Sequence, residues 1–247
     1  MRKLWNASKL VDNLTQEERL ELEKESLDEV DQWIFGELDK TLEEVTEHMQ
    51  AYEFSKARDK LRYFFWHTFC DDYLEIAKQR LSDEENSSAQ YALQEVHRAI
   101  VKMFAPFIPH ITEEIWNQMH ENNTIHRSSW PESSEVETDL EAGETAMEVI
   151  SALRKYKSDN QMALNQELDH VQVYGNISGM EQPIKETMHI TELESKEGEP
   201  ETEKKIIDIT LDYSNAGPKY GDKVSEIEDA LENSERMIED GRLKFAD

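Results

Sequence analysis

Residues with the chemistry of a metal site or an acid–base pair occur in this chain, but none belongs to a complete motif. His67 and Cys70 lie one helical turn apart, as two metal ligands on a helix would. A zinc site needs three or four ligands, however, and no second pair is placed to complete it. Asp71–Asp72 is one acidic pair among 55 carboxylates, and nothing marks it as an acid–base pair. We therefore predict no catalytic residue and no metal site, and we expect Cys70 to be a small core residue.

A glycine-containing segment near the C-terminus has a superficial likeness to a phosphate-binding loop. The segment GPKYGDK, residues 217–223, has three residues between its glycines where that loop needs four. Val224 stands where the loop has the Ser or Thr that binds magnesium. We expect a turn that opens a helix instead.

One segment has the residue types for binding a polyanion. Residues 54–80 contain six basic and four acidic side chains, a net charge of +2. Aromatic residues interleave with the basic ones: Phe54, Tyr63, Phe64, Phe65 and Trp66. Single-stranded or looped RNA needs basic groups for phosphate contact and exposed rings for base stacking. The same spacing also fits an amphipathic helix with buried rings and Lys and Arg paired to nearby acids, so both interpretations stay open.

The charge of the whole chain argues against a nucleic-acid partner. The 247 residues include 55 Asp and Glu but 27 Lys and Arg, for a formal charge of −28, and an acidic surface repels phosphate. The surplus is not a tail, since residues 1–132 carry 15 basic and 27 acidic side chains and residues 133–247 carry 12 and 28. This spread fits adaptation to a salty cytoplasm, where salt screens the repulsion, and equally an ordinary acidic protein.

Several classes of protein are excluded by composition. No run of about 18 apolar residues predicts a membrane span, and the N-terminal residues lack a signal peptide. Cys70 is the only cysteine, which rules out an intrachain disulfide and favours the reducing cytoplasm. Eight glycines and six prolines favour helices over a turn-rich β protein.

The elements that position these residues follow from apolar spacing. Apolar side chains recur at i, i+3 and i+4 and predict a short first helix around 4–11 and long helices over 28–50, 53–81 and 89–104. After the two-proline bend at 105–114, Thr112 is the expected cap of a further helix that reaches about Met119. Long helices with short joints predict an antiparallel helical bundle.

Composition changes at residues 130–144, which are polar and contain Pro and Ser, and we place a domain boundary there. Residues 1–132 are then the helical bundle, and residues 133–247 form a small α+β domain. In this second domain we expect helices over 142–158, 179–188 and 217–241 and strands over 170–175, 189–194 and 206–213. The predicted fold class is therefore mainly α.

Four segments carry a family resemblance: KLWNASKLV (3–11), ARDKLRYFFWHTFCDDYLEIAKQRL (57–81), VHRAIVKMFAPFIPHITEEIW (96–116) and VISALRKYKSDNQMALNQEL (149–168). Together they resemble the C-terminal part of the valyl-tRNA synthetase family in its archaeal form, over nearly the whole chain. The most specific pieces are the pattern W-x2-FCD-x-YLE-x2-K from Trp66 to Lys78 and the bend PFIPHITEEIW. The bend is shared with the isoleucyl, leucyl and methionyl relatives.

The resemblance implies a class Ia aminoacyl-tRNA synthetase, a ligase that attaches valine to tRNA-Val with ATP. The HIGH and KMSKS signatures of its catalytic domain are missing here. The chain is therefore expected to be the anticodon-binding portion, without a catalytic site, and ATP and Mg²⁺ belong to the catalytic domain of the same polypeptide. The implied partners are tRNA-Val and that catalytic domain, the implied state is a cytoplasmic monomer without membrane contact, and the acidic surplus indicates a halophilic archaeon.

The resemblance also directs attention to particular side chains on the basic aromatic segment and beside it. The residues expected to contact tRNA are Trp5, Asn6, Lys40, Phe54, Lys56, Arg58, Arg62, Arg154, Lys155 and Lys157. Phe54 would stack on a base, whereas Lys56, Arg58 and Arg62 would meet phosphates or base edges, and Lys40 would face the same groove. Trp5 and Asn6 would line the hinge where the anticodon stem passes. The second basic cluster, at 154–157, suits the RNA backbone.

Other functions stay open at this point. Within the family, the chain could be the same region of an isoleucyl- or leucyl-tRNA synthetase. Outside it, a freestanding acidic helical module that binds proteins would have the same composition. A complete small enzyme is disfavoured because catalytic motifs are missing.

Overall fold

The computed structural model describes residues 2–15, 22–23, 26–83, 86–119, 123–136, 138–196, 236–239 and 242–245. The chain divides into two compact units, residues 1–198 and 199–247. In the second unit the described residues form an antiparallel pair of strands, β3 (Arg236–Glu239) and β4 (Arg242–Phe245).

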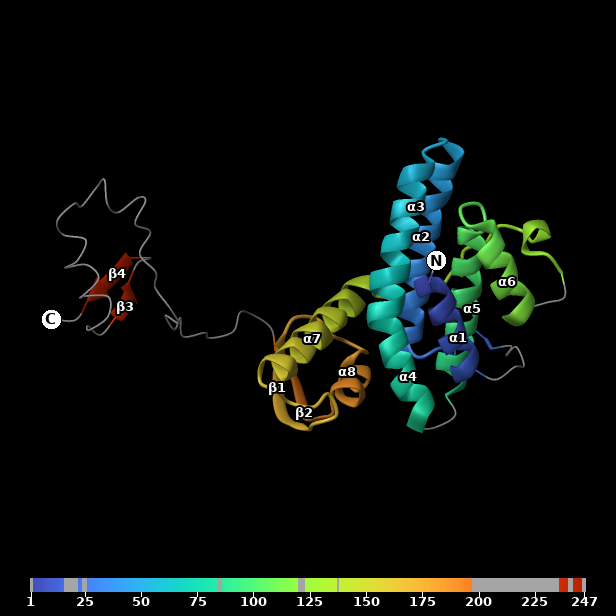
Figure 1. Ribbon diagram of the computed structural model, residues 1–247. Coiled ribbons are helices and arrows are strands. Elements are labelled where there is room, and N and C mark those ends of the chain that lie inside the picture. Colours follow the sequence, from blue (N-terminus) through green and yellow to red (C-terminus); the bar gives the residue numbers. More distant parts are fainter. Residues whose placement is uncertain are drawn as a thin grey trace, which may run out of the picture. The chain divides into compact units, whose positions relative to one another are not determined.

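The first part of the first unit is a bundle of helices (Figure 1). Its elements are α1 (Arg2–Leu14), α2 (Glu29–Gln50), α3 (Phe54–Tyr63), a π-helix η2 (Phe64–Tyr73), α4 (Leu74–Asp83), α5 (Ser87–Phe104) and α6 (Pro109–Met119). Helices α2 and α3 are joined by a short turn, so they form an antiparallel hairpin. The short turn η3 (Ile125–Arg127) follows α6. The prediction of a mainly helical bundle is confirmed.

The predicted helix over 53–81 is continuous, but its middle is not α-helical. Residues 64–73 form a π-helix, in which the Leu74 N–H donates to the Phe69 carbonyl, five residues back. A π-helical turn is wider than an α-helical turn and is commonly found at functional sites. Apolar periodicity did not reveal it, because the buried positions still recur about every fourth residue.

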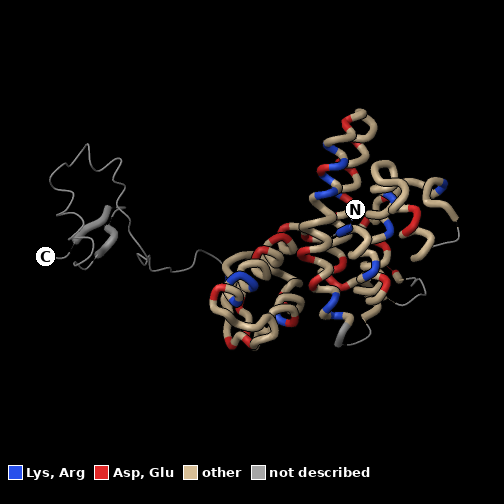
Figure 2. Tube along the Cα trace, viewed as in Figure 1, with Lys and Arg blue, Asp and Glu red and all other residues tan. Residues whose placement is uncertain are grey.

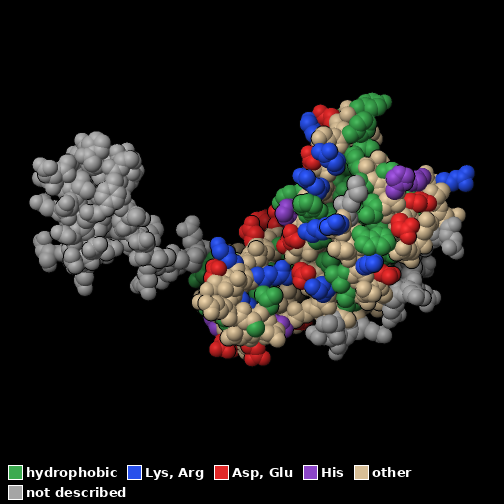
Figure 3. Space-filling model, viewed as in Figure 1, with side chains coloured by type: hydrophobic (Ala, Val, Ile, Leu, Met, Phe, Trp, Pro, Cys, Tyr) green, Lys and Arg blue, Asp and Glu red, His purple; other side chains and the backbone are tan. Residues whose placement is uncertain are grey.

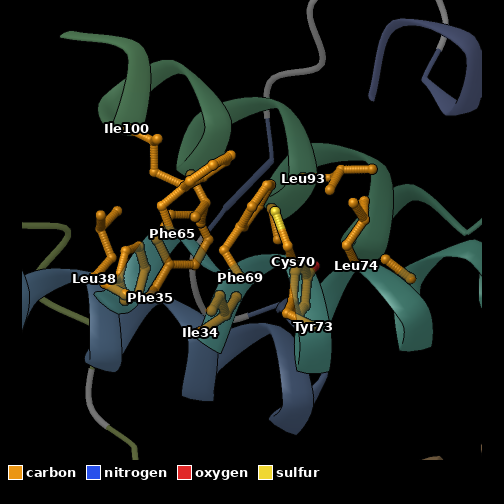
Figure 4. Close-up of a cluster of buried hydrophobic side chains, with 14 of the residues drawn as sticks. Ile34, Phe35, Leu38, Phe65, Phe69, Cys70, Tyr73, Leu74, Leu93 and Ile100 are labelled. Carbon is orange, nitrogen blue, oxygen red and sulfur yellow. The ribbon is translucent and has the colours of Figure 1, made fainter. Parts of the chain in front are cut away.

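The central cluster of the core lies between α2, η2 and α5 (Figure 4). The buried side chains there are Ile34, Phe35 and Leu38 from α2, Phe65, Phe69, Cys70 and Tyr73 from η2, and Leu93 and Ile100 from α5. Burial raises the pKa of the Cys70 thiol to about 12, so the thiol stays protonated and unreactive at neutral pH. The core prediction for Cys70 is confirmed, and no group of metal-ligating side chains occurs among the described residues.

A polar network is buried in the same bundle, on Asp31 of α2. The Asp31 carboxylate accepts hydrogen bonds from Tyr73 Oη at 2.7 Å, from Arg80 Nη1 at 2.7 Å and Nη2 at 2.9 Å, and from Ser88 Oγ at 2.5 Å. Arg80 also pairs with Asp28, just before α2. One buried carboxylate thus ties together α2, η2, α4 and α5, and its hydrogen-bonding capacity is satisfied.

The second part of this unit contains α7 (Leu140–Asp159), β1 (Leu168–Tyr174), α8 (Glu181–Met188) and β2 (Ile190–Lys196). Strands β1 and β2 pair in parallel, from Leu168 opposite Ile190 to Tyr174 opposite Lys196, because α8 forms the crossover between them. Gly143 of α7 lies against the Trp33 ring of α2, where a Cβ atom would clash. The predicted domain boundary at 132/133 falls inside this compact unit and stays a prediction.

Two sequence predictions of local structure are wrong. Thr112 is not a helix cap, because α6 already begins at Pro109, and its hydroxyl donates inside the helix to the carbonyls of Ile108 and Pro109. Proline fits the first turn of a helix, where its missing N–H has no intrahelical partner.

The expected helix over 217–241 is also wrong at its end, since residues 236–239 are strand β3. These residues pair with β4, from Arg236 opposite Phe245 to Glu239 opposite Arg242. The rest of that helix and the strand expected over 206–213 lie outside the described residues. None of the helices in the described ranges has the length and apolar character needed to cross a membrane.

Candidate nucleic-acid interface

The tip of the α2–α3 hairpin presents two aromatic rings to solvent. Tyr52 is 81% exposed and Phe54 is 49% exposed. Their ring centroids lie 6.1 Å apart at an interplanar angle of 90°. Tyr52 has a φ of 59°, a left-handed conformation that ends α2 and lets α3 turn back beside it. Phe54 was predicted as a stacking residue, and the structure places its ring where an unpaired base can reach it.

Along α3 basic residues recur (Figure 2), and basic side chains lie on the surface of this hairpin (Figure 3). Lys56, Arg58 and Arg62 are all exposed, as an interface with phosphates requires. Each has an acidic neighbour on the surface: Lys56 lies 2.7 Å from Glu53, and Arg58 and Arg62 lie 3.0 and 4.0 Å from Asp59. Exposed pairs of this kind contribute about 0–1 kcal/mol each, so phosphates can replace the carboxylates at little cost.

Both interpretations of residues 54–80 therefore hold in part. The three exposed cations pair with acids, as in the amphipathic-helix interpretation, and Phe64 and Phe65 are buried. Lys60 bonds Glu44 of α2 at 2.8 Å and braces the hairpin. Arg80 belongs to the buried Asp31 network. The segment is thus a basic and aromatic surface only over its first half.

At the junction of α3 and η2, Trp66 is 40% exposed and has two cations near its ring. The Arg62 guanidinium lies 5.5 Å from the ring centroid, and the Lys3 ammonium of α1 lies 5.4 Å from it. Beside them the exposed Tyr63 ring contacts His67, with 4.8 Å between centroids. We define these three residues, Lys3, Arg62 and Trp66, as the Trp66 platform.

Asp71 links the platform to α7. Lys3 Nζ donates to Asp71 Oδ1 at 3.0 Å, and Arg154 Nη1 donates to the Asp71 carbonyl at 3.0 Å. The structure therefore brings Arg154, which is more than eighty residues away in the sequence, onto the surface formed by α1 and η2. Lys155 is exposed on the same helix as Arg154.

The other predicted residues on α1 and α2 are on the surface but have separate neighbours. Trp5 is half-buried with Lys9 Nζ 5.0 Å from its ring centroid, and Asn6 is exposed. Lys40 pairs with Glu37 at 3.6 Å and with Glu144 of α7 at 3.4 Å. The charge of Glu37 raises the pKa of Lys40. The two acidic partners of Lys40 thus lie on α2 and α7 and not on α3.

Lys157 does not belong to the second basic cluster, contrary to the prediction. Its side chain is fully buried, and Nζ donates to the carbonyls of Leu164 at 2.8 Å, Gln166 at 2.6 Å and Met188 at 2.8 Å. All three ammonium hydrogens are used, so Lys157 joins α7 to the following loop and to the end of α8 and cannot contact RNA. Burial lowers the pKa of Lys157, while the three carbonyls favour its charged form.

An acidic group beside Arg154 has a raised pKa. Burial raises the pKa of Asp72 from 3.8 to about 6, although the nearby Arg154 charge acts in the opposite direction. At neutral pH this carboxylate is ionised and adds a negative charge behind the basic surface.

Sequence reasoning missed three parts of this surface: Lys3, Tyr52 and the platform role of Trp66. The aromatic content of 54–80 was a signal for Trp66. Spacing alone could not separate its exposed ring from the buried Phe64 and Phe65, and nothing local to α1 indicated that Lys3 reaches η2.

Exposed rings beside exposed cations are the side chains that recognition of unpaired RNA uses. Residues 31–173 match the family model described as the anticodon-binding domain of tRNA ligase, so the chain belongs to this family. Three of its relatives, each a valine–tRNA ligase, show the similarity over nearly the whole chain. The one from Haloarcula marismortui is 51% identical over 247 residues, which cover 100% of this chain and 27% of the relative. The one from Pyrococcus furiosus is 35% identical over 266 residues, which cover 99% and 30%.

A third relative, from Methanococcus maripaludis, is 32% identical over 269 residues, covering 98% of this chain and 30% of the relative. The chain therefore spans less than a third of the length of these relatives. The resemblance to the valyl-tRNA synthetase family is confirmed.

Proposed function

We propose that this chain holds the anticodon arm of tRNA-Val as part of a larger valine–tRNA ligase. The observation that carries the proposal is the surface that runs from Phe54 down α3 to the Trp66 platform. It combines exposed rings with exposed cations in a chain of formal charge −28. Family membership and the names of the relatives support the same function. In the whole ligase, ATP and Mg²⁺ would serve a catalytic domain outside this chain.

In this proposal, the two basic clusters contact different parts of the tRNA. Lys56, Arg58 and Arg62 meet the phosphates or base edges of the anticodon loop, and Phe54 offers a stacking face. Arg154 and Lys155 of α7 then lie along the backbone of the stem. RNA loops are recognised in this way, through splayed bases that stack on rings and through basic groups on the backbone.

The direct test measures how tightly the purified chain binds a tRNA-Val transcript. Binding is measured by a filter-binding assay at several KCl concentrations. The double variant Arg58→Ala plus Arg62→Ala is expected to weaken binding at least tenfold, because it removes two phosphate or base contacts. The matched control is Arg127→Ala plus Lys185→Ala, which removes the same charge from η3 and α8 and is expected to leave binding unchanged. Equal loss in both variants, or no binding at any salt concentration, would refute the mapping.

The tRNA identity and the oligomeric state need separate measurements. Competition with tRNA-Ile, tRNA-Leu and a tRNA-Val transcript with a swapped anticodon is expected to show preference for the valine anticodon. Sedimentation is expected to give a monomer with one tRNA bound. Preference for the isoleucine or leucine anticodon would instead assign the chain to one of those relatives.

A further inference from the structure

The Trp66 platform is built differently from the rest of the basic face. Trp66 is the third residue of the π-helix η2, and that helix is continuous with α3 and α4. Its neighbours Phe64 and Phe65 are buried in the core, whereas Trp66 is 40% exposed. A tryptophan buries a large apolar area when it packs inward, so a ring left in solvent in the middle of a core helix is a surface available to a ligand.

The two cations of the platform differ in how firmly the protein holds them. Lys3 Nζ donates to the Trp66 carbonyl at 3.4 Å and to Asp71 Oδ1 at 3.0 Å, which fixes the ammonium 5.4 Å from the ring centroid. Arg62 lies one helical turn before Trp66 and has only a weak pairing with Asp59, at 4.0 Å. Both cations therefore lie over the ring, so a base that stacks on the ring takes the place of one cation and leaves its charge free to pair with the accompanying phosphate.

This arrangement matches one nucleotide of an unpaired strand. A nucleobase stacks on an indole face, and the phosphate that accompanies it needs a cation nearby. Asp59 and Asp71 are the acids next to these cations, and both are exposed. A phosphate competes with them in solvent, where such pairs are weak.

We propose that Trp66 is the stacking surface for one unpaired base of the bound RNA, with Lys3 and Arg62 holding its phosphates. This inference rests on the proposed tRNA binding and adds to it a specific contact, formed by α1 and η2 together. It also assigns a role to the first helix of the chain: Lys3 completes a site that begins on α3.

The test uses tRNA-Val transcripts with 2-aminopurine at single positions of the anticodon loop, because stacking on a ring quenches its fluorescence. Binding is expected to quench one position strongly. Trp66→Ala is expected to abolish that quenching and to weaken binding about 5- to 150-fold, since stacking on an aromatic side chain is worth about 1–3 kcal/mol per base. Trp66→Phe, which keeps a ring, is expected to retain most of both.

The controls separate this inference from the proposed function. Tyr174→Ala removes another exposed ring, on β1, and is expected to change neither quenching nor affinity. If Trp66→Ala lowers the unfolding temperature, Trp66→Leu decides, because leucine fills apolar space without offering a stacking face. Unchanged quenching in Trp66→Ala or Trp66→Leu, with tRNA still bound, would overturn this inference alone. Failure of the unsubstituted chain to bind tRNA would overturn both.

Discussion

Replacing Arg80 by Met should destabilise the bundle far more than replacing an exposed basic residue of α4. The Arg80 side chain is 6% exposed, and its two terminal nitrogens bond Asp31, whose side chain is fully buried. The hydrogen bonds and charge of Asp31 raise the pKa of Arg80 although burial alone would lower it. The guanidinium is therefore charged in the fold at any ordinary pH.

The magnitude follows from what the substitution leaves behind. In Arg80→Met, the Asp31 carboxylate remains buried with only the hydroxyls of Tyr73 and Ser88 as donors. Removing one partner of a buried ion pair costs about 3–5 kcal/mol, because the other charge is left uncompensated. Against a total stability of about 5–15 kcal/mol for a domain, this loss moves the urea midpoint by a large part of its value.

The assay is urea unfolding followed by circular dichroism at fixed KCl, with a control on the same helix. Lys78→Met removes one positive charge from α4, but Lys78 pairs at 3.0 Å with the exposed Glu75, so its expected cost is below about 1 kcal/mol. Combining Arg80→Met with Asp31→Asn should cost less than the sum of the two single substitutions, since no lone charge then remains. Equal costs for Arg80→Met and Lys78→Met would refute the reasoning.

Four further predictions concern other parts of the unit and the charge of the chain. Lys157→Met should cost about 3 kcal/mol in urea unfolding, because it leaves three carbonyls without a donor, one of them fully buried; a cost under 1 kcal/mol would contradict this role. Asp72→Asn should stabilise the fold by about 1 kcal/mol at pH 7, a value reduced for partial exposure. The pKa of Asp72, raised from 3.8 to about 6, favours the protonated form in the fold, so the stability of the unsubstituted chain falls as pH rises through this window. The stability gained by Asp72→Asn should therefore vanish below pH 4. Asp12→Asn, at an exposed position, is the control, and a gain independent of pH would contradict the assignment. Gly143→Ala should cost about 1–3 kcal/mol or more by driving a methyl group into the Trp33 ring, and an unchanged thermal midpoint would show that α7 does not pack closely on α2. Screening of carboxylate repulsion should make tRNA binding flat or increasing with KCl and should lower stability in dilute buffer; a steep loss of binding with salt, with full stability in dilute buffer, would refute salt adaptation.

The sequence determined the helical bundle because its signals are local. The apolar spacing in α2 and α5 predicted those helices to within a few residues, and the alternation at 170–175 predicted β1. Burial of Cys70 also followed from its aromatic neighbours. In each case the nature of the residues within a few turns decides the structure, so no knowledge of distant contacts was required.

Local signals did not determine whether a basic side chain lies on the surface or in the interior. Lys157 and Lys155 have the same charge and stand two positions apart on α7, yet Lys155 is exposed and Lys157 is buried among three carbonyls. Those carbonyls come from residues 164, 166 and 188. The positions of the loop after α7 and of the end of α8 therefore decide whether Lys157 is a surface cation or an internal donor.

The candidate interface shows the same division. Sequence composition located the basic aromatic segment, and the family resemblance directed attention to Phe54, Arg58 and Arg62, all of which are exposed. Only the tertiary structure brings Lys3 to Trp66 and Arg154 to Asp71, over separations of 63 and 83 residues. The physical reason is that helix propensity and amphipathic spacing act within one helix, whereas a binding surface made from three helices depends on how their buried faces pack against one another.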